Sequence, residues 1–215
     1  MRAVLTTARL RGMLPDGLRA IVDSTGLEAR HVSVHFEHRR HGPGRGKNRG
    51  RAPPPTYPML AVVCDQRSHL WLSAKAFMGP RNEAPFFEPV VRQAAARARI
   101  DTILADAAFD TDACHALCRD TLGIRSTVIP IHPRGNGRGW PKGTYRRQMR
   151  RRFHRRVYAQ RRQVESSFSG TKRRFGSALR RTSPLGRTHE CLLWALVHNL
   201  AIVPRPRRRG SQQSR

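Results

Sequence analysis

Three acidic side chains stand where a metal-dependent reaction would need them. Asp23 directly follows a run of Ala, Ile and Val, and Asp106 follows a run of Ile, Leu and Ala, so each is expected at the end of a strand. In a sheet sandwiched by helices, such positions face the crevice where ligands bind. Carboxylate oxygens suit Mg²⁺ or Mn²⁺, and two such ions about 4 Å apart can promote phosphodiester cleavage. Ordinary turn chemistry fits as well, with Asp23 opening an Asx turn and Asp106 capping a helix.

The third acid, Glu165, lies in a basic segment with helical spacing. The pattern is Tyr158-x2-Arg161-x3-Glu165-x6-Lys172, which places these four side chains within an arc of about 60° at roughly 100° per residue. An apolar stripe on the adjoining side consists of Met149, Phe153, Val157, Val164, Phe168 and Phe175. If this stripe docks on a sheet, Glu165 lies at the rim of the contact, where it could meet the two aspartates. The alternative is a solvated face with an i,i+4 ion pair.

The rest of the chain predicts a mixed α/β fold. Short apolar runs predict strands at 18–23, 59–65, 70–77, 102–105 and 126–131, with an extended piece at 31–36 and a turn at 24–26. Helical patterns with caps predict helices at 89–100, 112–122, about 144–174 and 188–203. Gly-rich loops are expected at 38–58 and 133–143. This order of elements indicates a central sheet flanked by helices.

Positive charge dominates the chain and concentrates in its second half. The 215 residues carry a formal net charge of +28, and residues 121–215 hold 24 Lys and Arg but only two acids, Glu165 and Glu190. Because guanidinium groups pair well with phosphate oxygens, this composition points to a polyanionic partner. The four cysteines lack regular spacing, which argues against a disulfide framework and favours a reducing, intracellular location. No apolar stretch is long enough to span a membrane.

Three motifs together resemble a known family. They are Val-Asp-Ser-Thr-Gly around Asp23, Ala-Asp-Ala-Ala-Phe-Asp around Asp106, and the Tyr-Arg-Glu-Lys pattern around Glu165. They look like bacterial insertion-sequence transposases of the ribonuclease H-like DDE superfamily, specifically the insertion-sequence-four and -five groups, over about residues 19–203. The resemblance implies a ribonuclease H-like mixed sheet and a triad of these three acids holding two divalent ions, Mg²⁺ or Mn²⁺.

The resemblance also implies partners. Tyr158, Arg161 and Lys172 would contact transposon-end DNA, with Arg and Lys positioning the strand through its phosphates. The implied activity is hydrolysis of a phosphodiester at a transposon end, followed by attack of the freed 3′-hydroxyl on target DNA. A homodimer on double-stranded DNA and a bacterial cytoplasmic, nucleoid-associated location follow from the same likeness.

The likeness divides the chain into a remnant N-terminal segment (1–17), a catalytic domain (18–203) with the basic loop 38–58 inserted, and a basic disordered tail (204–215). Family members usually carry a DNA-binding segment before the first Asp, so a truncated copy is expected. Ala108-Phe109 also stands where the family often has Gly-Tyr. Two other functions therefore stay open: an inactive transposase relic, and a non-enzymatic basic protein that coats nucleic acid.

Overall fold

The structure is a computed structural model that describes residues 1–29, 57–79, 83–132 and 139–203. The predicted extended piece at 31–36 and the predicted tail at 204–215 lie outside the described residues. The predicted loop at 38–58 also lies outside them, except for its last two residues, which belong to a strand. In the described part of the chain, no helix is both long and apolar enough to cross a bilayer. The predicted location stays a prediction.

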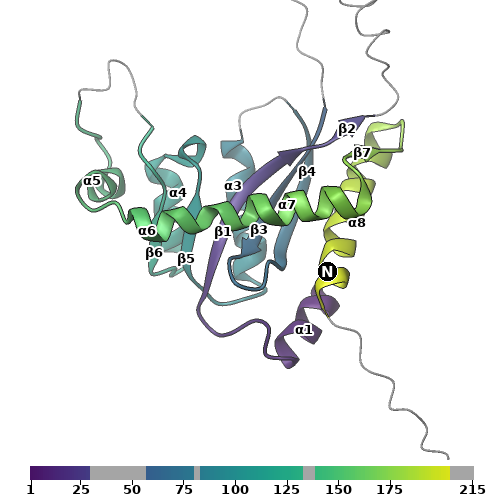
Figure 1. The fold of residues 1–215 in the computed structure, drawn as a ribbon. Coiled ribbons are helices and arrows are strands. Elements are labelled where there is room, and N and C mark those ends of the chain that lie inside the picture. The colour runs from purple at the N-terminus through teal and green to yellow at the C-terminus, as the bar shows by residue number, and fades with distance from the viewer. Residues whose placement is uncertain (30–56, 80–82, 133–138, 204–215) are drawn as a thin grey trace, which may run out of the picture.

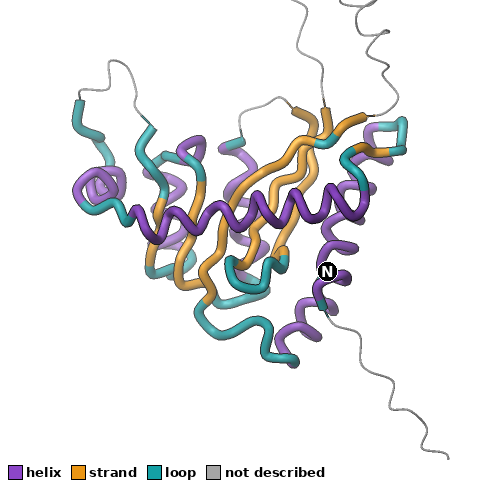
Figure 2. Tube along the Cα trace, in the orientation of Figure 1, coloured by secondary structure: helices purple, strands orange, loops and turns teal. Residues whose placement is uncertain are grey.

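A five-stranded mixed sheet forms the centre of the fold (Figure 2). Its strands are β1 (Leu18–Gly26), β3 (Tyr57–Asp65), β4 (Trp71–Gly79), β5 (Ile100–Ala105) and β6 (Ser126–Val128). They are arranged in the order β4-β3-β1-β5-β6, in which β4, β3 and β1 pair antiparallel while β5 and β6 extend the sheet in parallel from β1. Two short strands, β2 (Glu28–Ala29) and β7 (Ala178–Leu179), form a separate ladder.

Helices cover both faces of the sheet (Figure 1). They are α1 (Arg2–Leu10), α3 (Ala84–Ala95), α4 (Asp112–Ala116), α5 (Thr144–Arg151), α6 (Arg155–Tyr158), α7 (Arg162–Phe175) and α8 (Pro184–Ile202). One core cluster joins α1, α3 and α4 to one face, and a second joins α7 and α8 to the other. Figure 1 shows α7 crossing the front of the sheet with α3 and α4 behind it. The predicted mixed α/β sheet flanked by helices is confirmed.

The local predictions hold best where hydrophobic alternation is strong. The hairpin of β3 and β4 and the strands β1 and β5 lie where apolar runs predict them. The predicted turn at 24–26 is wrong, because β1 continues to Gly26 and pairs with β3. The helix predicted at 89–100 begins earlier, at Ala84, because Pro85 rather than Pro89 occupies its first turn. The last helix also begins earlier than predicted, since the Ser183 hydroxyl caps it by accepting from the Gly186 N–H.

The single long helix predicted at 144–174 is also wrong. The chain instead forms α5, then a break at Arg152 with φ −137° and ψ 67°, then α6, a 3-10 turn at Ala159–Arg161, and α7. The two ends of this region pack on different parts of the molecule, since α5 contacts α4 whereas α7 contacts β1. A straight helix could not serve both contacts. The break also lets Phe153 pack against the core that α7 covers.

Asn199 of α8 completes the hydrogen bonding of the sheet's edge strand. Its side-chain oxygen accepts from the Trp71 N–H at 2.8 Å, and its amide donates to the Trp71 carbonyl, also at 2.8 Å. Both residues are fully buried. The Trp71 indole in turn donates to the Ser167 hydroxyl of α7 at 2.6 Å. These bonds hold the two helices of this face against the sheet at a defined register.

We predict that Asn199→Leu lowers the free energy of unfolding by about 2 to 4 kcal/mol, because it leaves the buried Trp71 N–H and C=O without partners. Urea unfolding measures the change. The control is Leu200→Ala, one residue further on α8 but 53% exposed, for which a change within about 0.5 kcal/mol is expected. Equal losses in the two variants would contradict the bridging role of Asn199.

Candidate active site

Two adjacent parallel strands place the two aspartates side by side. In the register of β1 and β5, Val22 lies opposite Ala105, so Asp23 and Asp106 occupy the next position of each strand. Side chains along a strand alternate between faces. Ile21 and Leu104 belong to the core beneath α7 and α8, and each aspartate lies two residues beyond one of them. Both carboxylates therefore point to the face that α7 covers.

The guanidinium of Arg161 contacts all three predicted acids. One terminal nitrogen lies 2.9 Å from Asp23 Oδ2, and the other lies 3.3 Å from Asp106 Oδ2 and 3.1 Å from Glu165 Oε1. Arg161 ends the 3-10 turn that leads into α7, and Glu165 lies one turn further along. The structure thus brings together side chains from β1, from the end of β5 and from α7. It also includes the predicted i,i+4 ion pair of the basic segment.

The turn-chemistry alternatives for the aspartates do not hold. Asp23 lies within β1, where its Oδ1 accepts from the Ser24 N–H at 2.9 Å, and it opens no turn. Asp106 precedes a 3-10 turn but makes no side-chain cap bond to it. Both carboxylates instead form ion pairs with Arg161.

Burial sets the ionisation of Asp23. The carboxyl group is only 15% exposed, and this burial raises its pKa to about 6, although Arg161 and the Ser24 N–H act in the opposite direction. Burial alone would lower the pKa of the Arg161 guanidinium, but the negative charges of Asp23 and Asp106 raise it above its ordinary value. Around Arg161 the nearby negative charges outweigh burial, whereas at Asp23 burial outweighs the one nearby guanidinium. The cluster therefore carries excess negative charge at neutral pH.

Tyr158 and Lys172 lie along the same face but play different parts in it. Tyr158 ends α6, packs on Phe153 with ring centroids 5.2 Å apart, and has a pKa raised chiefly by burial. The Lys172 ammonium donates to the carbonyl of Gly26 at 2.9 Å, at the far end of β1. The structure brings Tyr158 next to Arg161 but ties Lys172 to the backbone. Their predicted contacts with DNA stay predictions.

A hollow of about 400 Å³ adjoins the cluster on the side of α6. It is lined by Phe153, Arg155, Tyr158, Ala159, Arg161 and Arg162. Three arginines and two aromatic rings thus line one opening, whose surface is mainly apolar, and Arg161 belongs both to it and to the carboxylate cluster. The arginines are the groups here that suit a phosphate, because guanidinium forks pair well with phosphate oxygens.

Sequence reasoning missed the brace that anchors the basic segment. Arg146 of α5 makes a two-pronged ion pair with Asp110 at 2.7 to 2.9 Å, and Asp110 is fully buried at its carboxylate. Asp112 accepts from the N–H groups of Tyr145 and Arg146 and so caps α5. A Cβ on Gly143 would lie 2.2 Å from the Asp112 carboxyl carbon, so this approach requires glycine. Asp110 ends the second Asp motif and Asp112 follows two residues later, but no local pattern pairs either acid with α5.

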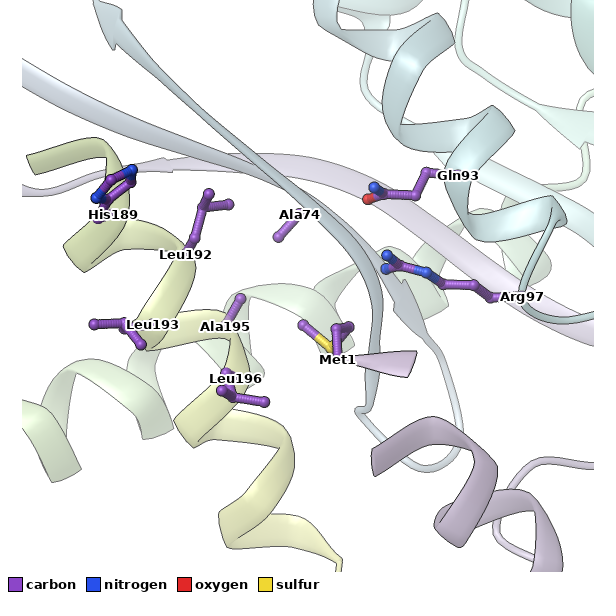
Figure 3. A pocket seen from close by; sticks show the side chains of 9 residues that line it. All are labelled: Met1, Ala74, Gln93, Arg97, His189, Leu192, Leu193, Ala195 and Leu196. Carbon is purple, nitrogen blue, oxygen red and sulfur yellow. The ribbon is translucent and has the colours of Figure 1, made fainter. Parts of the chain in front are cut away.

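A second cavity lies elsewhere and does not belong to this site (Figure 3). It measures about 600 Å³ and lies among α8, β4, the end of α3 and Met1. Figure 3 shows Leu192, Leu193 and Leu196 of α8 on one side and Arg97 on the other. Its lining includes neither the three acids nor Arg161, which contacts them. Size alone would therefore select the wrong place for chemistry.

The donor chemistry of the carboxylate cluster fits a divalent cation, since hard ions such as Mg²⁺ prefer carboxylate oxygens. Three carboxylates from separate elements already converge on a cation, the Arg161 guanidinium. As the side chains now stand, however, the described residues contain no group of three or more His, Cys, Asp and Glu side chains that could hold a metal ion. The position between the carboxylates is taken by Arg161.

Comparison with known proteins agrees with this geometry. A family model described as a transposase DDE domain matches residues 15–200. The chain belongs to the transposase DDE domain family. Domains of this family generally use divalent metal ions. No curated protein matches the chain.

One similar solved structure is the piggyBac transposase in a synaptic complex with hairpin DNA. The TM-score is 0.53 and the identity 11%, and the match covers 94% of this chain and 52% of that one. The chain thus spans about half the length of that transposase. At this identity the likeness concerns the fold, and the predicted ribonuclease H-like mixed sheet flanked by helices is confirmed.

We predict that Asp23→Asn removes a pH dependence of stability. Because the pKa of Asp23 is raised from 3.8 to about 6 in the folded chain, the wild type loses about 3 kcal/mol relative to the variant as the pH rises from about 4 to 6. Above pH 6 the difference becomes constant. Denaturant unfolding of both proteins in EDTA, at half-unit pH steps, measures it. A wild type that gains on the variant over this range would show that Arg161 outweighs burial.

Proposed function

We propose that this chain carries out metal-dependent DNA strand cleavage and transfer in DNA transposition. One observation carries the proposal: Asp23, Asp106 and Glu165, far apart in sequence, converge on one cation beside a hollow whose lining includes three arginines. Membership of the transposase DDE domain family supports it. The proposed reaction is hydrolysis of a phosphodiester at a transposon end, then attack of the freed 3′-hydroxyl on target DNA.

Each part of the site has a proposed role. Asp23, Asp106 and Glu165 would hold Mg²⁺ or Mn²⁺, expected as two ions. When bound, such ions supply an activated water and stabilise the leaving oxygen. The carboxylate of Asp23 is ionised at neutral pH, because even its raised pKa lies near 6, so it is ready to bind a cation.

The cationic side chains would position the DNA backbone. Tyr158 and Arg161 line the hollow next to the carboxylates, together with Arg155 and Arg162. Lys172 lies further along the face, at the end of β1, where its ammonium could leave the Gly26 carbonyl for a phosphate. Contacts of this kind set the register of the strand rather than read its sequence. A homodimer holding two transposon ends is part of the proposal.

The domain scheme stays a proposal as well. We assign the catalytic domain to 18–203. The segment 1–17 includes α1, whose Leu5 and Ala8 are buried in the core beneath α3 and α4. This segment therefore contributes to the stability of the proposed catalytic domain, whatever its relation to a DNA-binding region.

We predict that Glu165→Gln lowers Mg²⁺-dependent nicking of a plasmid carrying the element's flanking ends by about a hundredfold or more, because one of the carboxylates proposed to hold the metal ions is lost. DNA binding, measured by filter retention, should persist or strengthen. Glu88→Gln is the matched control, since it makes the same charge change on a side chain 58% exposed, against 54% for Glu165, and away from the cluster. Its nicking should equal that of the wild type.

Two outcomes would favour the other functions. A wild type that binds DNA without nicking, and whose binding is unaffected by Glu165→Gln, would indicate a transposase relic. A wild type that never nicks, together with a Glu165→Gln variant whose DNA binding collapses, would indicate a basic nucleic-acid-binding protein in which Glu165 is structural.

We predict that DNA affinity falls about 10³-fold or more between 50 and 200 mM salt, as expected when several phosphates are neutralised. Arg155→Gln and Arg162→Gln, which alter the hollow, should each reduce the slope of log K against log salt by about one. Filter binding with duplex DNA at four salt concentrations measures these slopes. A flat dependence would show that the hollow does not bind the backbone.

A further inference from the structure

Arg161 is the structural centre of the carboxylate cluster. In the described part of the chain, the ion pairs of Asp23, Asp106 and Glu165 all run to this one guanidinium. We propose that Arg161 is a built-in substitute cation, which holds the three carboxylates together before metal binds and is displaced from them when metal arrives. This inference rests on the proposed function, because it assumes that the same carboxylates bind metal.

The geometry makes metal and Arg161 competitors. Two nitrogens of one planar group lie within 3.3 Å of oxygens from all three carboxylates, and the side chain is only 17% exposed. An ion that used the same oxygens would meet this guanidinium at close range, and like charges repel strongly in a partly buried site. As the side chains stand, the described residues contain no group of three or more His, Cys, Asp and Glu side chains that could hold a metal ion, and Arg161 occupies the position between the three carboxylates. Metal binding therefore requires Arg161 to move.

Charge favours the exchange. Three carboxylates face one guanidinium, so the cluster keeps excess negative charge that a divalent ion compensates better than a monovalent group. Arg161 in its present place still reduces repulsion among the acids, which allows the site to fold without metal. The Arg161 guanidinium thus stabilises the metal-free cluster and opposes metal binding through the same contacts. The guanidinium and the metal ion bind the same carboxylates, and each weakens the binding of the other by the same free energy.

The displaced side chain has a place to go. Arg161 already lines the hollow shared by Arg155, Tyr158 and Arg162. It lies where the 3-10 turn meets α7, so rotation of its side chain leaves both elements in place. In the hollow the guanidinium would face a DNA phosphate instead of the carboxylates. Metal binding would then supply the DNA site with one more cation.

The test measures metal binding itself. We expect Arg161→Gln to bind Mn²⁺ about tenfold more tightly than the wild type, because the competing cation is gone. Free Mn²⁺ is counted by electron paramagnetic resonance during titration of EDTA-stripped, DNA-free protein with MnCl₂. Arg173→Gln is the matched control, since it removes the same charge from an exposed position in the last turn of α7. It should bind Mn²⁺ like the wild type.

Two further variants secure the interpretation. Arg161→Lys keeps a charge but lacks the fork that reaches three carboxylates, so an intermediate affinity is expected. If Arg161→Gln does not fold without metal, the Mn²⁺ affinity of Arg161→Lys tests the inference in its place. Adding Glu165→Gln to Arg161→Gln should weaken the binding again, which places the ion on the carboxylates.

The outcomes separate this inference from the proposed function. Equal or weaker Mn²⁺ binding by folded Arg161 variants, with a wild type that does bind, overturns the inference and leaves the metal site intact. Absence of Mn²⁺ binding in every variant overturns both. Tighter binding by Arg161→Gln that persists after Glu165→Gln is added also overturns it, because the ion then binds elsewhere.

Discussion

Three negative charges placed at one junction of sheet and helix are the constraint on which this structure depends. Carboxylates that lie close together repel one another, and Asp23, which is only 15% exposed, also loses hydration, so a cation among them stabilises the cluster. Arg161 supplies that cation from the turn before α7, with nitrogens 2.9 to 3.3 Å from the three carboxylates. Burial raises the pKa of Asp23 to about 6 in spite of Arg161, so the guanidinium does not fully offset the cost of burying this carboxylate. A site in this condition is prepared for a more highly charged ion.

The scaffold achieves this convergence through two independent devices. Parallel pairing of β1 with β5 sets Asp23 and Asp106 side by side on one face of the sheet. Val164 and Phe168 of α7 pack against the same face, which holds Arg161 and Glu165 next to the two aspartates. The break after α5 is equally necessary. It allows the Arg146–Asp110 ion pair to hold α5 against the loop that follows Asp106 while α7 crosses the sheet.

The division of charge matches the function proposed for a member of the transposase DDE domain family. Three acids from separate elements gather in one small cluster, while arginines line the adjoining hollow and supply most of the charge of the C-terminal half. A polyanionic substrate would be repelled by the acids alone and held by the hollow. Arg161 lies between the carboxylate cluster and the hollow, so its guanidinium can pair either with the carboxylates or with a phosphate in the hollow.

The sequence by itself determined the approximate places of the five strands in the central sheet, the three acids as candidates and the family, because alternation, helical spacing and short motifs are local properties. The alternation Ile21-x-Asp23 even encodes which face Asp23 takes. Only the tertiary structure decided that Arg161 binds Asp23, that Lys172 bonds to Gly26, and that Arg146 pairs with Asp110. These partners lie 138, 146 and 36 residues apart. Their pairing depends on strand register and on where the basic helix breaks, and neither is written in a local pattern.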